Sequence, residues 1–256
     1  MRVKSSARAI REEPLLNFLG KSETDRLARL AGILYLLVLP TAGPWYYTSA
    51  AMLGGNAATL ATLEAGRRTL EVVILLGAVG HTVQLLAAVL LYRLLSPFGK
   101  IAASLTLILL AVSMPLSFAA IARETDLLAL LDRAQELTAL GAAQLQAQIT
   151  LTADAYTSLA KTAAFFWGLW LFPLGWVLWR SRYVPRVIAA CVMLGGPLYV
   201  QAFVGPLFDL NYATSLVSSV IGFVSGIPDL IGEIGVALWL TVMGARSDRR
   251  ATLAAE

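Results

Sequence analysis

Two carboxylic acids stand one helical turn apart inside an apolar stretch near the end of the chain, Asp229 and Glu233. A charged carboxylate inside a membrane-spanning helix costs about 2.5 to 3.5 kcal/mol on insertion scales, so such groups usually face protein or water and mark functional sites. Carboxyl groups in apolar surroundings are also the groups that general acid–base chemistry uses. We therefore predict that Asp229 and Glu233 are candidate acid–base residues.

The same helix face carries small residues above the acids. Gly222, Gly226, Asp229 and Glu233 follow one another at steps of four, three and four, which places them on one side of a helix. The glycines are expected to let another helix approach closely. Pro228 removes a backbone donor, which predicts a bend and a free carbonyl beside the acids. Such a face can bind a cation or a polar ligand head.

The second apolar stretch offers a matching face with the same spacing, Gly77, His81, Gln84 and Ala88. His81 is the single histidine and is a third candidate acid–base group, because midspan imidazole suits a proton relay. One histidine and one cysteine argue against a transition-metal site, so no metal is predicted. The plain alternative is an interhelical hydrogen bond from His81 to Glu233 or Asp229, worth about 0.6 kcal/mol in membranes. Both interpretations stay open.

Further polar residues occur at midspan positions or beside predicted kinks. Pro115 and the run Gly195–Pro197 mark the kinks, where hydroxyl groups or water must satisfy freed backbone groups. If these faces converge, they enclose a polar chamber near the middle of the membrane that opens outward. The predicted ligand-binding residues are Gln84, Lys161, Tyr199, Gln201, Ser113 and Ser117.

Composition sets the class of protein. Apolar residues make up 58% of the 256 residues, charged residues only 14%, and the mean hydropathy is +0.72. A soluble domain does not have this balance. The basic residues flank apolar stretches instead of alternating with aromatics, so nucleic acid is not an expected partner. The chain has no phosphate-binding loop, zinc-protease motif or paired histidines for haem, and no cofactor is predicted.

Hydropathy predicts an all-α polytopic membrane protein, a bundle of six transmembrane helices that occupies residues 27–244. A charged arm (1–26) precedes it and a short tail (245–256) follows. Residues 123–155 are expected to form an extracytoplasmic helical connector along the outer surface, either as a lid over the chamber or as a packed link. The predicted spans are 27–50, 69–95, 101–122, 156–179, 187–208 and 217–243.

Basic residues predict the orientation. Fifteen of the 20 Lys and Arg flank the side that carries both termini, four flank the other side, and Lys161 falls within a span. By the positive-inside tendency, both termini are cytoplasmic.

Four segments resemble a known family. They are Arg29–Leu36, Leu91–Leu95, the aromatic run Phe165–Arg186, and the stretch from Gly232 to Leu240. Over about residues 26 to 244 the chain resembles the bacterial membrane family known as domain of unknown function 4386. The resemblance implies a six-helix protein of the bacterial cytoplasmic (inner) membrane without an assigned activity. It also implies that Glu233 stands where the family tends to carry a glutamate.

Three functions are consistent with these observations. The first is a cavity that binds a small or lipid-like molecule and can perform acid–base chemistry of the cyclase or isomerase type. The second is a proton-coupled carrier, for which a homodimer is expected because six helices are few for alternating access. The third is a membrane scaffold or sensor subunit whose polar groups only join helices. The lipid bilayer is the expected surrounding in all three.

Overall fold

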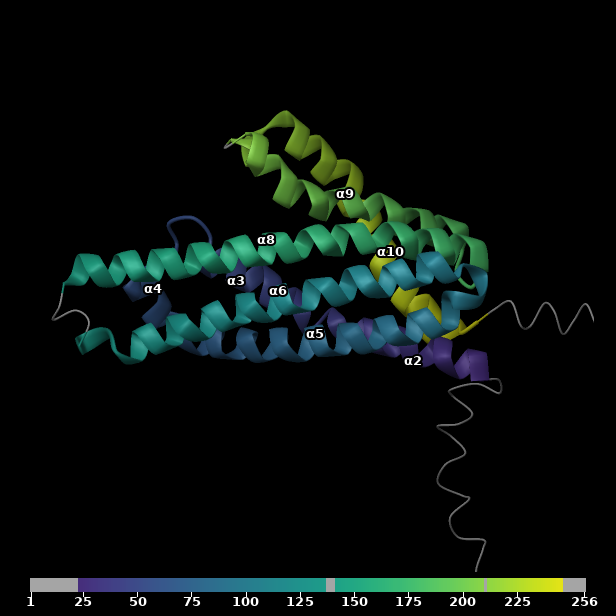
Figure 1. Ribbon diagram of the computed structural model, residues 1–256, viewed down its shortest axis with the longest axis horizontal. Coiled ribbons are helices and arrows are strands. Elements are labelled where there is room, and N and C mark those ends of the chain that lie inside the picture. Colours follow the sequence, from purple (N-terminus) through teal and green to yellow (C-terminus); the bar gives the residue numbers. More distant parts are fainter. Residues whose placement is uncertain (1–22, 137–140, 210, 246–256) are drawn as a thin grey trace, which may run out of the picture.

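The computed structural model describes residues 23–136, 141–209 and 211–245, which form helices and no strands. Most of the predicted arm (1–22) and of the tail (246–256) lies outside these residues. Within them, six helical units are long and apolar enough to cross a membrane, so the predicted class is confirmed (Figure 1). The units are α2 (Glu23–Val38) with α3 (Ala42–Leu53), α5 (Arg67–Leu95), α6 (Lys100–Asp132), α8 (Ala142–Ser181), α9 (Arg186–Phe208) and α10 (Leu216–Met243). Shorter helices join some of them: α4 (Leu60–Ala65), η1 (Ser96–Phe98) and η2 (Tyr212–Thr214).

The first span is broken, which the sequence reasoning missed. Pro40 and Pro44 each lack a backbone N–H, so a regular helical ladder cannot continue through this region. The Thr41 hydroxyl instead donates to the carbonyl of Leu37 over 2.6 Å. The backbone N–H of Leu39 bonds to the carbonyl of Leu36 over 3.2 Å, a tighter turn than an α-helix. The chain therefore changes course between α2 and α3.

Residues 123–155 are mostly the far ends of two long helices. The segment is predicted to be a helical connector along the outer surface, and its side of the membrane stays a prediction. In the described residues α6 continues to Asp132 and α8 begins at Ala142, so both ends of the segment prolong the helices of two spans. No glycine or proline occurs from Leu116 to Leu140, so nothing in this stretch ends the helix early. The α6–α8 pair runs side by side as a long antiparallel hairpin (Figure 1).

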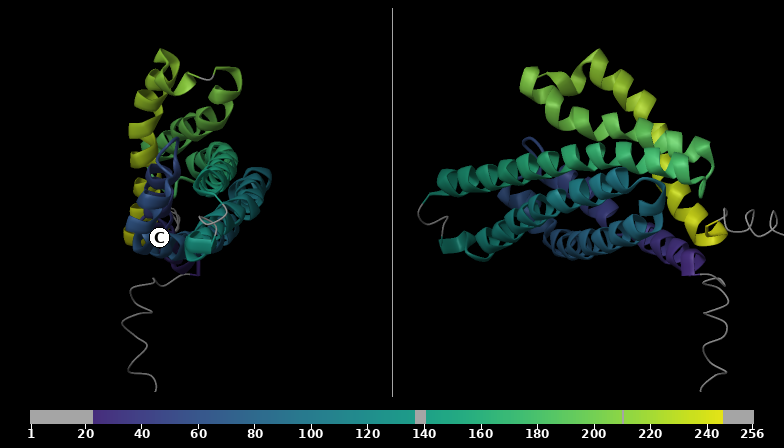
Figure 2. Two further views of the ribbon diagram at one scale, coloured as in Figure 1. Left: turned by 90° about the vertical axis from the view of Figure 1, so that its left-hand side faces the viewer. Right: turned by 45° about the vertical axis from the view of Figure 1, so that its right-hand side comes forward.

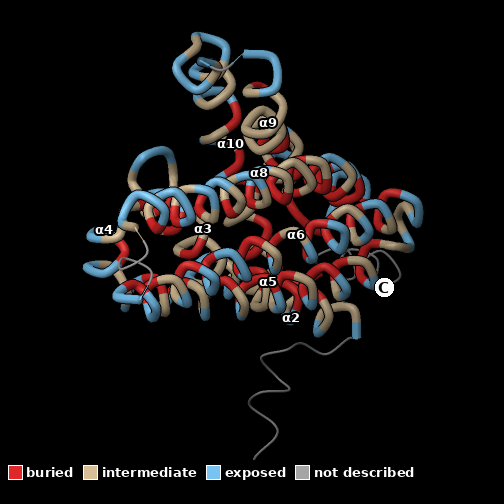
Figure 3. The backbone as a smooth tube through the Cα atoms, turned by 60° about the vertical axis from the view of Figure 1, so that its left-hand side comes forward, coloured by how far each residue is buried: buried red, intermediate tan, exposed pale blue. Residues whose placement is uncertain are grey.

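The central helix of the bundle is α8. In the most apolar stretch of α8, 56% of the residues are buried, compared with 22% in the corresponding stretch of α9. Buried positions follow the inner sides of the helices, and pale blue exposed positions gather at turns and outer faces (Figure 3). Many outer-face residues are large and apolar, such as Ile101 (80% exposed) and Phe223 (75% exposed). Such a surface is compatible with lipid contact, which removes it from water.

The end of the α9–α10 hairpin that carries η2 lies away from the long α6–α8 pair, as both views in Figure 2 show. This divergence contradicts the expected close helix contact at Gly222 and Gly226. A Cβ atom added at either position would meet nothing within 4 Å. The close approach lies lower on α10, where a Cβ at Gly232 would come 2.6 Å from the backbone nitrogen of Val192.

The first and last spans meet at one end of the bundle. Oδ1 of Asp25 accepts a hydrogen bond from the backbone N–H of Ala245 over 3.1 Å. The Arg29 guanidinium donates to the carbonyl of Thr241 over 3.3 Å. These contacts hold the start of α2 beside the end of α10, as expected for an even number of crossings.

Candidate functional site

A pocket of about 400 Å³ lies beside the break in the first span. The last turn of α2 and the first turns of α3 form one wall, and the middle of α10 forms the opposite wall. Residues of α5, α8 and α9 complete it. The lining residues are Tyr35, Val38, Leu39, Ala42, Gly43, Pro44, Tyr46, Tyr47, Gln84, Trp167, Trp170, Tyr199, Asp229, Leu230, Glu233 and Ile234.

Both predicted acids line this pocket, and each accepts a hydrogen bond from a tyrosine of another helix. The Tyr35 hydroxyl donates to Oε1 of Glu233 over 2.9 Å, and the Tyr199 hydroxyl donates to Oδ2 of Asp229 over 3.0 Å. Among the described residues, neither carboxyl group has a basic partner. Within the described ranges, the pocket therefore holds two acidic groups without a cationic side chain beside them.

Asp229 is held against a glycine of α9. A Cβ atom at Gly195 would come 2.5 Å from Oδ1 of Asp229, so the absence of a side chain at Gly195 makes room for the carboxyl group. Asp229 is 8% exposed, and its Oδ1 has no hydrogen-bond partner within the described ranges. A buried polar atom without a partner is costly and needs an explanation such as a bound ion, water or ligand.

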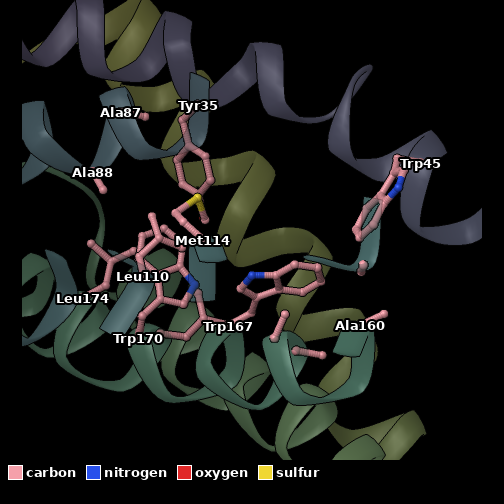
Figure 4. Packing of buried hydrophobic residues seen from close by; sticks show 14 of the residues in the cluster. Tyr35, Trp45, Ala87, Ala88, Leu110, Met114, Ala160, Trp167, Trp170 and Leu174 are labelled. Carbon is pink, nitrogen blue, oxygen red and sulfur yellow. The ribbon is translucent and has the colours of Figure 1, made fainter. Parts of the chain in front are cut away.

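Aromatic rings form much of the remaining wall. Trp167 and Trp170 lie on neighbouring turns of α8, with Tyr35 reaching toward them from α2 (Figure 4). The ring centroids of Tyr35 and Trp170 are 6.0 Å apart, and those of Tyr46 and Trp167 are 5.6 Å apart. The rings meet edge to face, a favourable geometry for aromatic pairs. The pocket therefore combines a rigid aromatic surface with two carboxyl groups.

The mouth of the pocket lies on the side of the bundle. Three lining residues are well exposed: Tyr47 (72%) on α3, Leu230 (60%) on α10 and Leu39 (39%) at the break. All three belong to spans, and two are aliphatic. The exposed part of the lining therefore lies between α3 and α10, on the side of the bundle.

His81 is not part of the pocket lining. Its side chain is fully buried, and Nδ1 lies 2.7 Å from the carbonyl oxygen of Gly77 in its own helix. Nε2 has no hydrogen-bond partner in the part of the chain that the structure describes. The alternative in which His81 bonds to Glu233 or Asp229 is therefore not realised. Instead, the imidazole packs against Trp45 and Trp167, with ring centroids 4.7 and 5.7 Å away.

A second buried acid, Glu124, was overlooked in the sequence. It is fully buried, and its Oε2 accepts a hydrogen bond of 2.7 Å from the indole N–H of Trp45. Ser49 and Tyr156 flank it, with the Ser49 hydroxyl beside both the Glu124 carboxyl group and the Tyr156 hydroxyl. Trp45 thus lies between this acid and His81, and it joins α3 to α5 and α6.

The remaining predicted ligand residues lie in different places. Of the six, Gln84 and Tyr199 line the pocket. Ser113 lies behind the aromatic wall, where its hydroxyl accepts from the indole N–H of Trp167 over 3.1 Å. Ser117 donates to the carbonyl of Ser113 over 3.1 Å. Gln201 accepts from the Tyr212 hydroxyl over 3.0 Å, and Lys161 lies on the exposed side of α8.

Sequence reasoning also missed several pocket residues. Tyr35, Tyr46 and Trp170 stand within predicted spans and are pocket residues that were not among the predicted site residues. A usable signal exists for the first of these, since Tyr35 stands five residues before a proline inside a span. Broken membrane helices frequently mark binding sites. No such signal exists for Trp170, because its position in the wall depends on tertiary packing.

Comparison with known proteins decides the family. The family model described as "Domain of unknown function (DUF4386)" matches residues 30–244, which include every residue of the pocket. The chain belongs to this family. No curated protein and no solved structure matches the chain. For this DUF4386 protein, what the site can do must be inferred from its geometry.

That geometry permits two kinds of chemistry. No group of three or more His, Cys, Asp or Glu side chains within the described residues is arranged to hold a metal ion. Asp229 and Glu233 can accept a cationic group or exchange a proton with a bound molecule. The tyrosine hydroxyls orient both carboxyl groups toward one cavity.

Proposed function

We propose that this DUF4386 protein binds a small or lipid-like molecule, which it takes from the bilayer into the pocket between α2–α3 and α10. The observation that carries the proposal is the pair Asp229 and Glu233 in a cavity without a basic partner among the described residues. Its volume of about 400 Å³ is within the usual range for small-molecule sites. Its lateral mouth, formed by Leu39, Tyr47 and Leu230, favours a ligand that partitions into lipid.

Retention of a ligand through purification tests the proposal. Gly43 lines the pocket, and a Cβ atom there meets nothing within 4 Å, so Gly43→Trp adds a bulky side chain at the pocket wall without displacing backbone. Gly222→Trp is the matched control, because Gly222 also has open space around it but lies outside the pocket lining. Native mass spectrometry of gently solubilised protein is expected to show a molecule retained by the wild type and Gly222→Trp and lost from Gly43→Trp. Equal retention by all three proteins, or by none, contradicts the proposal.

Acid–base chemistry of the cyclase or isomerase type is part of the same proposal. Glu233 and Asp229 are the groups that would exchange protons with the bound molecule, and their position inside one aromatic cavity supports this role. Glu233→Gln and Asp229→Asn test it. If the retained molecule is a substrate, these variants are expected to convert each bound molecule more slowly than the wild type does. Conversion at the wild-type rate excludes the chemical role.

A proton-coupled carrier is the second candidate, favoured by the break between α2 and α3. Transporters commonly place substrate and proton sites where a membrane helix is interrupted. Here the interrupted segment lies directly opposite the two acids. Proteoliposomes with an imposed proton gradient provide the test, and gradient-driven uptake that Glu233→Gln abolishes would support this candidate. A homodimer is proposed for this case, and crosslinking of a Phe223→Cys variant on the exposed face of α10 would detect it.

We place the protein in the bacterial cytoplasmic membrane with both termini inside. The six apolar helices support a multi-pass protein, and the distribution of basic residues supports this orientation. The contact between Asp25 and Ala245 keeps the ends of the first and last spans on one side, whichever side that is.

A further inference from the structure

We infer that the pocket selects an organic cation, an ammonium or phosphonium group with hydrophobic substituents and without a phosphate. This inference rests on the proposed function and names the class of its ligand. It follows from three properties of the lining: the sign of its charge, the nature of its rings and the position of its mouth.

Charge is the first property. Asp229 and Glu233 are the ionisable acids of the lining, and none of the described lining residues is Lys, Arg or His. Each carboxyl group accepts a hydrogen bond from a tyrosine hydroxyl, and no basic side chain of the described lining pairs with either. A bound cation would favour the ionised form of both carboxyl groups. An anionic ligand would oppose their ionisation.

The aromatic wall is the second property. Six aromatic residues line one cavity: Tyr35, Tyr46, Tyr47, Trp167, Trp170 and Tyr199. The faces of aromatic rings attract cations through their quadrupole, and cages of such rings recognise quaternary ammonium groups. Mutual ring contacts hold Trp167 between Tyr46 and Tyr199, with centroid separations of 5.6 and 6.4 Å. These contacts hold the rings of the wall in place without a ligand.

The lateral mouth is the third property, and it separates two sources of such a cation. A phospholipid with a choline or ethanolamine head would bring its phosphate along with the ammonium group. Guanidinium and ammonium groups are the usual protein partners of phosphate, and the described lining has neither. An aliphatic entrance at Leu39 and Leu230 suits hydrophobic substituents. The favoured ligand is therefore a lipophilic cation that dissolves in the bilayer and is not a phospholipid head.

Equilibrium dialysis with two ions of matched shape tests this inference. Tetraphenylphosphonium is the cationic probe and tetraphenylborate is the anionic probe, each corrected for binding to protein-free micelles. The wild type is expected to bind the cation at least about tenfold more tightly than the anion. Added phosphatidylcholine is expected to leave cation binding unchanged, and a tetraalkylammonium salt is expected to displace it. Displacement by phosphatidylcholine contradicts the phosphate-free assignment.

Variants locate the bound cation. Glu233→Gln is expected to weaken cation binding about tenfold. Glu71→Gln is the matched control, since Glu71 is paired with Arg67 and Arg68 on α5 outside the pocket, and it is expected to leave binding unchanged. Tyr47→Leu removes an exposed ring at the mouth with little risk to folding and is expected to weaken cation binding as well. Gel filtration and thermal unfolding confirm that each variant is folded.

The following outcomes overturn the inference, and the proposed function can still be tested separately from it. If both ions bind equally and Gly43→Trp removes both, the pocket binds ligands without selecting cations. If neither ion binds above the micelle background, or if Glu233→Gln and Tyr47→Leu leave cation binding unchanged, the pocket is not a cation site. Native mass spectrometry of the retained molecule then decides the proposed function independently.

Discussion

The Tyr35 hydroxyl on α2 donates a hydrogen bond to Oε1 of Glu233 on α10 over 2.9 Å, although 198 residues separate them in the chain. This contact lies in the pocket and joins the first and sixth spans. Tyr199 makes the corresponding contact from α9 to Asp229. The acids are thus positioned by side chains from other spans, which makes their geometry testable by mutation.

The Tyr35–Glu233 contact is expected to contribute a small but measurable coupling energy. In a double-mutant cycle of Tyr35→Phe and Glu233→Gln, we expect about 0.6 kcal/mol and at most about 1.7 kcal/mol, the range measured for hydrogen bonds between membrane helices. Equilibrium unfolding in mixed micelles with increasing dodecyl sulfate measures it. The same cycle made with Tyr92→Phe in place of Tyr35→Phe is the control. Additive effects of the two pocket substitutions would contradict the contact.

Trp45, which is fully buried, is expected to be more important for stability than the tryptophans on the outer faces. Trp45→Phe removes the donor to the fully buried Glu124 and leaves a carboxyl group without that partner, at a cost of about 1 to 3 kcal/mol. Trp176→Phe, at a position 44% exposed, is the control and is expected to change unfolding little. Adding Glu124→Leu to Trp45→Phe removes the unpaired group and is expected to recover part of the loss. No recovery would show that Trp45 acts through packing alone.

Two glycines of α10 are expected to respond oppositely to the same substitution. A Cβ atom at Gly232 would come 2.6 Å from the backbone nitrogen of Val192, so Gly232→Ala is expected to destabilise the protein by about 1 to 3 kcal/mol. Gly222 has open space around it, and Gly222→Ala is expected to be neutral or slightly stabilising. Unfolding of the two variants under the same conditions measures the difference. Equal effects would mean that α9 and α10 do not pack as described.

Orientation in the membrane is testable with single cysteines. In a Cys191→Ala background, Asn211→Cys lies in the exposed α9–α10 turn and Lys100→Cys lies at the exposed start of α6. If both termini are cytoplasmic, a membrane-impermeant maleimide added to intact cells is expected to label Asn211→Cys and not Lys100→Cys. Permeabilised cells provide the control, in which both are labelled. The reverse pattern on intact cells would place the termini outside.

Hydropathy was sufficient to predict the six spans, because a bilayer requires long apolar helices and leaves few other solutions. It could not predict the break in the first span from apolarity alone, since Leu36–Leu39 and Ala42–Trp45 are both compatible with a continuous helix. Pro40 and Pro44 were the available signal. Their spacing removes two donors from one stretch of backbone.

The candidate site was only partly predictable. Asp229 and Glu233 stand out because carboxyl groups are rare within apolar spans. His81 is also a polar group that is rare within an apolar span, yet Trp45 and Trp167 pack against its ring and separate it from the acids. Helical periodicity in the sequence does not predict this packing. Glu124 gives no signal, because it follows Arg123 in a charged stretch that looks solvated. Its burial depends on α3 and α8 covering it.

The pocket draws its walls from both α2 and α10, the first and sixth spans. At bacterial or eukaryotic synthesis speeds of about 5 to 20 residues per second, about 10 to 40 s pass between the appearance of Tyr35 and that of Glu233 on the ribosome. During that interval Tyr35 is in the membrane without its acidic partner. The pocket is therefore completed only in a late event of biogenesis, and a nascent chain that stalls before α10 lacks one of the pocket walls.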